Sequence, residues 1–121
     1  MKIAVIGASN NREKFGNKCV RAYLMKGHEV FPVNPKEERI EGLKAYKSVP
    51  DIPEKIDVVS LYLPPEIGMR VADDIIKKKA PKIFLNPGTE SDALIEKLKK
   101  HGIDVQARCS IVAIGINPSE L

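Results

Sequence analysis

Four short segments carry the glycine, proline, asparagine and serine residues from which ligand-binding turns are often built. They are 7–14, 34–36, 61–65 and 86–89, and each follows or ends a run of apolar, largely β-branched residues. In an open parallel sheet, ligands bind beyond the carboxyl ends of the strands, where the strand order reverses. We therefore expect the four segments to meet at one rim of a sheet and to form one binding site.

The first segment has the composition of a phosphate-binding turn. Gly7 permits a tight exit from the preceding strand, and the following helix presents free backbone N–H groups that favour an anion. The side chains placed to assist are those of Ser9, Asn10, Asn11, Arg12 and Lys14. Ser9 stands where the dinucleotide fingerprint G-x-G-x-x-G has its second glycine, so that fingerprint is absent. An ordinary strand-to-helix turn is the alternative interpretation.

The second segment, Val33-Asn34-Pro35-Lys36, ends a strand with a neutral residue followed by a basic one. Proteins that bind NAD place an acidic residue at this point, where it accepts hydrogen bonds from the ribose hydroxyls. A cation here suits a phosphorylated ribose, as in coenzyme A or NADP. Glu37 and Glu38 keep NAD as a minor alternative, and an exposed loop lysine is the simpler interpretation of Lys36.

The third and fourth segments lack a catalytic acid, base or nucleophile. Leu61-Tyr62-Leu63-Pro64-Pro65 forms an apolar wall that fits an adenine ring or a pantetheine arm. Leu85-Asn86-Pro87-Gly88-Thr89 offers an amide and a rigid turn, which could hold pantetheine or a pyrophosphate. A proline-started helix and a capped turn are the corresponding structural alternatives. These segments therefore predict binding rather than catalysis.

The elements that position these segments alternate between strands and helices along the chain, which predicts an α/β fold with a single doubly wound, Rossmann-like parallel sheet. The predicted strands are Lys2–Ile6, Glu29–Val33, Leu43–Tyr46, Asp57–Leu63, Lys82–Leu85 and Ile103–Ala107. We expect the order 3-2-1-4-5, with the last strand at the far edge. Helices are predicted over Phe15–Lys26, Pro65–Lys79 and from a cap at Thr89 or Ser91 to Gly102. The inward face of the first helix is expected to carry Phe15, Cys19, Ala22 and Tyr23. We expect one domain over residues 1–121.

Composition limits the function further. The chain is 43% hydrophobic and 30% charged, and it contains no apolar run near the roughly 20 residues that cross a bilayer. The net charge is +4, but the lysines cluster at helix ends and aromatic residues make up only 5%, so we expect no nucleic-acid partner. Cys19 and Cys109 lack metal-site or disulfide spacing, so we expect no metal and a reducing cytoplasm, with Cys19 buried.

With these residues in view, the chain resembles the small stand-alone CoA-binding proteins of the Rossmann type. They are similar to the CoA-binding domain of the succinyl-CoA synthetase alpha subunit. The matching pieces are Val5–Asn11 with Lys14 and Gly16, Val33–Pro35, Leu61–Pro64, Asn86–Gly88 and Arg108-Cys109. The resemblance implies that Cys109 lies near the coenzyme thiol. The candidate coenzyme A-binding residues are Gly7, Ala8, Ser9, Asn10, Asn11, Arg12, Lys14, Asn34, Pro35, Lys36, Leu63, Pro64, Leu85, Asn86, Pro87 and Cys109.

The function expected from this resemblance is non-covalent binding of coenzyme A or an acyl-CoA without catalysis. The synthetase uses a phosphate-carrying histidine in a second domain and a partner subunit, and neither His28 nor His101 resembles that histidine. One alternative is an NADP-dependent oxidoreductase or redox sensor. Another is an enzyme subunit that docks its partner through the apolar segment Ile111–Ile116. The sequence leaves open whether the chain forms homo-oligomers.

Overall fold

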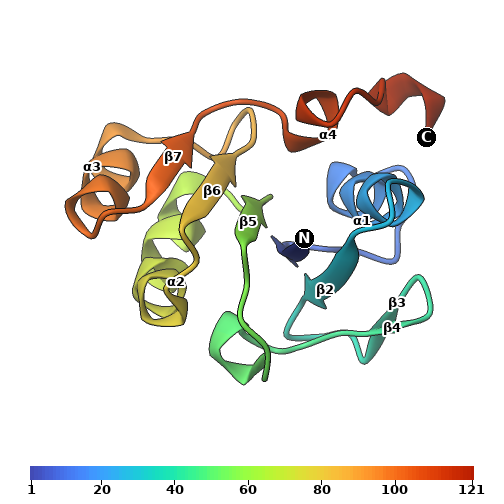
Figure 1. The fold of residues 1–121 in the computed structure, drawn as a ribbon, viewed down its shortest axis with the longest axis horizontal. Helices are drawn as coiled ribbons and strands as arrows, with labels where there is room; N and C mark the ends of the chain where they lie inside the picture. The colour runs from blue at the N-terminus through green and yellow to red at the C-terminus, as the bar shows by residue number, and fades with distance from the viewer.

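A five-stranded parallel sheet forms the centre of the computed structural model, which describes residues 1–121 (Figure 1). Its order is β2-β1-β5-β6-β7. The strands are β1 (Lys2–Ile6), β2 (Glu29–Val33), β5 (Val58–Leu61), β6 (Lys82–Leu85) and β7 (Asp104–Gln106). The predicted fold class and strand order are confirmed for these five strands. Because all five run in parallel, their carboxyl ends meet at one rim of the sheet.

The predicted third strand, Leu43–Tyr46, joins the sheet only through its last residue. β4 (Leu43–Lys44) pairs instead with β3 (Arg39–Ile40) in a two-stranded antiparallel hairpin. Tyr46 then forms a single parallel bridge to Val33, donating its N–H to Pro32 and accepting from Asn34. The segment therefore occupies the expected place beside β2 but is too short to continue the sheet.

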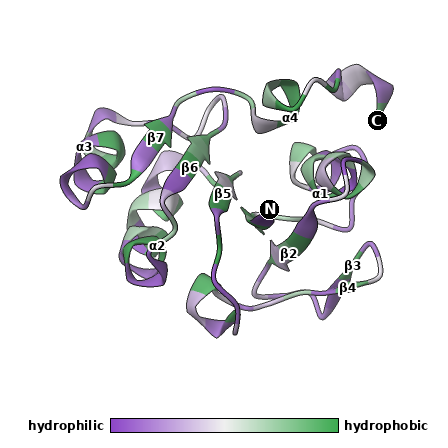
Figure 2. Ribbon diagram, viewed as in Figure 1, coloured by the Kyte–Doolittle hydropathy of each residue, from purple (hydrophilic) through white to green (hydrophobic).

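Helices cover both faces of the sheet. They are α1 (Phe15–Met25), α2 (Pro65–Lys78), α3 (Asp92–Lys100) and the short α4 (Ser110–Ala113), with 3₁₀ turns η1 (Val49–Asp51) and η2 (Pro118–Glu120). Figure 1 shows α2 and α3 on one face and α1 and α4 on the other. Two hydrophobic cores result, one on each side of the sheet. The hydrophobic residues concentrate on the strands and on the helix sides that face them (Figure 2).

The helix ends agree closely with the sequence signals, but the predicted inward face of the first helix needs one correction. Ser91 caps α3, its hydroxyl accepting from the N–H of Leu94 at 3.2 Å. Cys19 is buried on the inward face of α1, as predicted. Phe15, however, is 52% exposed, so its predicted place on the inward face is wrong. It belongs to the first turn of α1, which projects past the carboxyl end of the sheet. No helix has both the length and the apolar character needed to cross a membrane.

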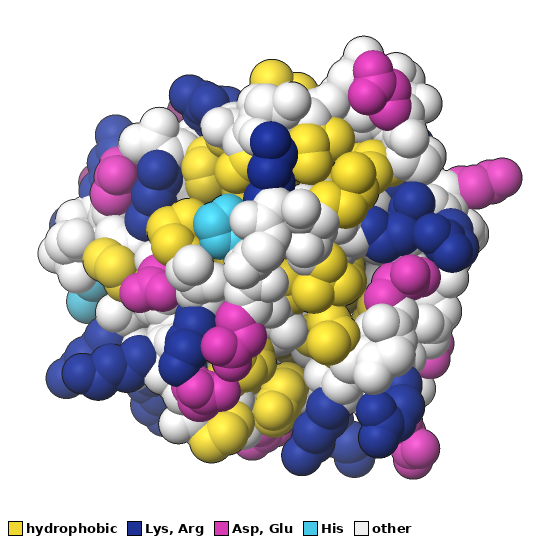
Figure 3. Space-filling model, turned by 45° about the vertical axis from the view of Figure 1, so that its right-hand side comes forward, with side chains coloured by type: hydrophobic (Ala, Val, Ile, Leu, Met, Phe, Trp, Pro, Cys, Tyr) yellow, Lys and Arg dark blue, Asp and Glu magenta, His cyan; other side chains and the backbone are white.

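Charged side chains are distributed in several separate groups. Figure 3 shows hydrophobic side chains gathered in the middle of the side that carries α1 and α4, with Lys, Arg, Asp and Glu around them. Val112 of α4 and Leu24 and Met25 of α1 are among the exposed hydrophobic residues. The basic residues thus do not form a single continuous patch on this face.

Two glycines set how closely α1 approaches the end of β1. A Cβ atom added to Gly16 would lie 2.2 Å from the carbonyl oxygen of Gly7, far inside van der Waals contact. Gly7 itself has a φ of +86°, which favours glycine, and a Cβ there would lie 2.6 Å from the carbonyl oxygen of Tyr62. The close contact brings the first turn of α1 directly onto the loop that follows β1.

We predict that Gly16→Ala lowers the free energy of unfolding by about 1–3 kcal/mol, because the methyl group must push the helix away from the loop. Gly68→Ala is the matched control: its added Cβ would meet only the flexible side chains of Leu94 at 3.2 Å and Leu61 at 3.4 Å. Urea unfolding of both variants measures the difference. Equal stability of the two would contradict this account of the α1 contact.

Candidate functional site

Three hollows lie side by side at the carboxyl-end rim of the sheet. The first cavity has a volume of about 400 Å³ and is enclosed by the ends of β1 and β2, the segment before η1, and α2. The loop hollow lies over the turn between β1 and α1. The terminal cavity is smaller, about 140 Å³, and lies between α1 and the loop after β6. Together they run across the middle of the rim, where the strand order reverses.

Shared lining residues make the three hollows one continuous site. Gly7, Asn34 and Leu63 line both the first cavity and the loop hollow. Phe15 and Tyr62 line both the loop hollow and the terminal cavity. A single elongated ligand could therefore extend from one end to the other without leaving the rim.

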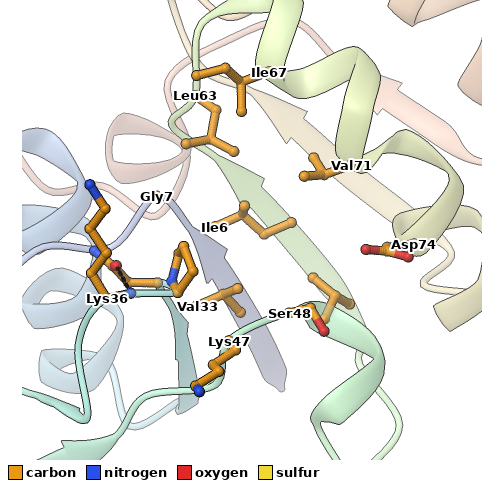
Figure 4. A pocket seen from close by; sticks show the side chains of 13 residues that line it. Ile6, Gly7, Val33, Lys36, Lys47, Ser48, Leu63, Ile67, Val71 and Asp74 are labelled. Carbon is orange, nitrogen blue, oxygen red and sulfur yellow. Dashed lines mark hydrogen bonds between the residues drawn. The ribbon is translucent and has the colours of Figure 1, made fainter.

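The first cavity combines apolar walls with two lysines. Figure 4 shows the side chains of Ile6, Val33, Leu63 and Val71 around it, with Lys36 and Lys47 on one side and Asp74 on the other. Lys36 and Lys47 are exposed, and neither makes an ion pair within the chain. The cavity can therefore accept an apolar, flat group that carries an anion at its edge.

The loop hollow presents backbone N–H groups and one further cation. The N-cap of α1, Lys14, makes no side-chain capping bond, and the first turn contains no acidic residue. The N–H groups of Phe15 and Gly16 have no acceptor within the chain. Such a helix start attracts an anion through its free donors and its dipole. The geometry thus suits a phosphate or pyrophosphate.

Asn34 fastens the loops on either side of the first cavity to each other. Its Nδ2 donates to the carbonyl oxygen of Ala8 at 2.8 Å, and its Oδ1 accepts from the N–H of Lys36 at 2.8 Å. The carboxamide therefore holds the turn after β1 against the turn after β2. This intramolecular role sets the spacing of the site.

Asn86 has a similar structural role at the terminal cavity. It is 1% exposed, and its Nδ2 donates to Ser60 Oγ and to the carbonyl oxygen of Leu61, both at 2.9 Å. Its Oδ1 accepts from the N–H of Ser110 at 2.9 Å. Asn86 thus ties β5, β6 and the start of α4 together and places Cys109 beside the cavity.

A buried group of hydroxyls and one thiol supports this end of the site. Ser110 Oγ lies 2.8 Å from Ser60 Oγ, 3.2 Å from the Tyr62 hydroxyl and 3.6 Å from Cys19 Sγ. Burial raises the pKa of the Cys19 thiol and of the Tyr62 hydroxyl above their ordinary values. Both groups therefore stay neutral at physiological pH.

Most of the residues predicted from the sequence line the three hollows. They are Gly7, Ala8, Ser9, Lys14, Asn34, Pro35, Lys36, Leu63, Asn86, Pro87 and Cys109. The other five predicted residues lie outside these linings. Asn10 bonds Glu37 and the carbonyl oxygen of Arg39, Asn11 accepts from Glu13, and Arg12 lies 3.9 Å from Glu41. Pro64 is the N-cap of α2, and Leu85 is fully buried in the core.

Several lining residues were absent from the predicted set. Lys47 and Ser48 follow Tyr46 and reach the first cavity because that segment lies beside the end of β2. Ligands bind beyond the carboxyl ends of parallel strands. The same rule, applied to the predicted strand Leu43–Tyr46, would have indicated Lys47 and Ser48. Ile67, Val71 and Asp74 recur at helical spacing on the side of α2 that faces the first cavity. The alternation of core and cavity positions on one helix is not visible in the sequence.

We predict that Asn86→Ala lowers the free energy of unfolding by about 2–4 kcal/mol, because it leaves the buried Ser110 N–H unpaired and removes the side-chain bonds to Ser60 and to the Leu61 carbonyl. The amide of Ser110 should also exchange with deuterium faster. Asn10→Ala, which removes two exposed hydrogen bonds from the same rim, is the control and should cost about 1 kcal/mol or less. A loss for Asn86→Ala no larger than that of the control would argue against the role given to this carboxamide.

Comparisons with known proteins agree with this geometry. Residues 1–115 match the family model described as a CoA binding domain. A conserved hypothetical protein from Pyrococcus furiosus is similar in structure, with a TM-score of 0.87 and 41% identity over 93% of this chain and 97% of that chain. The uncharacterized protein YneT of Bacillus subtilis is 29% identical over 84% of this chain and 75% of its own length.

Larger proteins contain the same unit. The alpha subunit of an ADP-forming acetate–CoA ligase from Pyrococcus furiosus is 46% identical over 51% of this chain, a match that spans 14% of that subunit. The chain therefore corresponds to only a small part of that relative. The resemblance inferred from the sequence is confirmed, and because the family model spans residues 1–115, the chain belongs to the family of CoA binding domains.

Proposed function

We propose that this chain binds coenzyme A or an acyl-CoA non-covalently, with no chemistry of its own. One observation carries the proposal: three hollows of different character are joined through shared residues into one path along the sheet rim. Coenzyme A has a phosphorylated adenosine, a pyrophosphate and a thin, weakly polar arm that ends in a thiol. The order of the hollows matches the order of these parts.

The first cavity would hold the adenosine. Ile6, Val33 and Val71 would provide the apolar surface for the base, and Lys36 and Lys47, which line the same cavity, would contact the 3′-phosphate. A lysine forms a charge-assisted hydrogen bond with phosphate that is stronger than a neutral one. The fold therefore adds a second cation, Lys47, to the one predicted from the position of Lys36.

The remaining parts would follow along the rim. The N–H groups at the start of α1, with Lys14, would hold the pyrophosphate. Leu63 and Tyr62 would contact the pantetheine arm, and the terminal cavity would receive the thiol beside Cys109. These residues bind and orient; no acid–base pair lies among them that would point to a reaction.

We predict that the protein binds coenzyme A more tightly than dephospho-CoA. Lys36→Ala should remove most of this difference, because it lowers the affinity for coenzyme A about three- to tenfold. Dephospho-CoA affinity should change little. Lys99→Ala, an exposed lysine at the end of α3, is the matched control. Calorimetric titration of each variant with both ligands gives the values.

Parallel titrations with NADP and NAD separate the proposal from the oxidoreductase alternative. Coenzyme A should bind tightest, and its affinity should fall as salt is raised. Equal affinity for coenzyme A and dephospho-CoA would remove the role given to Lys36, and tighter binding of NADP would refute the coenzyme A assignment.

We predict that Cys109 forms a mixed disulfide when the protein is incubated with the disulfide of coenzyme A. The Cys109 thiolate attacks one sulfur, the new S–S bond forms, and one coenzyme A thiolate leaves. Intact mass spectrometry should show one coenzyme A adduct on the wild type and none on Cys109→Ser. Cys19 is fully buried and serves as the internal control. An adduct that persists in Cys109→Ser would contradict the placement of the thiol end.

A further inference from the structure

We propose that the terminal cavity selects the acyl state of the ligand by size: it accepts the free thiol or a small acyl group and disfavours long ones. This inference rests on the proposed function, because it concerns the far end of the same ligand. It is carried by the size of the cavity and by the hydrogen bonds that fix its floor.

The size of the cavity limits the acyl group that the sulfur can carry. Its volume is about 140 Å³, compared with about 400 Å³ for the first cavity. Since a water molecule occupies roughly 30 Å³ in the liquid, the space holds about five groups of that size. An acetyl group is within this limit, and an eight-carbon acyl chain is well beyond it.

The lining consists of Phe15, Tyr62, Asn86, Pro87 and Cys109. The Asn86 amide already donates to Ser60 and Leu61, so its side chain is held in the floor of the cavity. The limit that these side chains set on the acyl group is therefore one of size.

The floor of the cavity cannot easily give way. Tyr62 is held by its hydroxyl against Ser110, and Asn86 is held by three hydrogen bonds to two strands and to α4. A chain that enlarged the cavity on this side would break buried hydrogen bonds. Phe15 is the wall that is free to change, because it is half exposed and packs against Lys18 at the surface.

Calorimetric titration with coenzyme A, acetyl-CoA and octanoyl-CoA tests this selection. Acetyl-CoA should bind within threefold of coenzyme A, and octanoyl-CoA should bind at least fivefold more weakly than acetyl-CoA. A difference below fivefold between acetyl-CoA and octanoyl-CoA overturns the inference. Failure to bind coenzyme A at all would instead refute the proposed function, so the two failures are distinguishable.

Phe15→Ala tests whether the cavity wall causes the selection. Removing the ring should lower the affinity for coenzyme A and acetyl-CoA together, but it should bring octanoyl-CoA to within twofold of acetyl-CoA. Leu24→Ala, an exposed residue of the same helix that lines none of the three hollows, should leave every ratio unchanged. An unchanged octanoyl-to-acetyl ratio in Phe15→Ala would overturn the assignment to this wall.

Discussion

The packing of backbone against backbone at Gly7 is the constraint on which the rest of the site depends. Its N–H bonds the carbonyl oxygen of Val33 at 3.1 Å, its carbonyl faces Gly16 of α1, and its α-carbon lies against Tyr62. The end of β2, the first turn of α1 and the segment after β5 thus meet at one glycine. A side chain at Gly7 or Gly16 would separate them, and the first cavity and the loop hollow would no longer share a wall.

Two asparagines stabilise what this packing brings together. Asn34 joins the turns after β1 and β2, and Asn86 joins β5, β6 and the start of α4. Amides that are paired away from water favour one arrangement over its near alternatives, because a shifted loop would leave a polar atom without a partner. The hydrogen bonds therefore make the rim a fixed frame, and the exposed lysine side chains lie at its edge. A preformed frame lowers the entropic cost of ordering a ligand.

Much of the fold follows from the sequence because the signals are local and repeated. Four of the five parallel strands are largely apolar runs, and the three longer helices have a proline, a cap or a glycine at an end, as with Pro65, Ser91 and Gly27. The order of the strands follows from the handedness of the crossovers. The sequence did not predict the hairpin before Tyr46. Only two residues pair on each of its sides, so its pattern is too short to be distinguished from a loop.

The site was harder to predict because side-chain direction depends on tertiary contacts. The turns were found by their place after a strand, yet Leu85 points into the core and Asn10 toward Glu37. Phe15 looked like part of an amphipathic face, but its position in the first turn puts it beyond the sheet. Lys47 reaches the first cavity only because Tyr46 pairs with β2. A pattern identifies the rim, and long-range packing decides which side chains line it.

The central claim is that one ligand lies along all three hollows. Amide chemical-shift mapping of the isotope-labelled protein during a coenzyme A titration tests it most directly. We expect the largest shifts at Gly7, Gly16, Lys36, Leu63 and Cys109, all at the carboxyl-end rim. Shifts confined to the opposite end of the sheet, around Gly27, Glu29 and Asp57, would contradict the account.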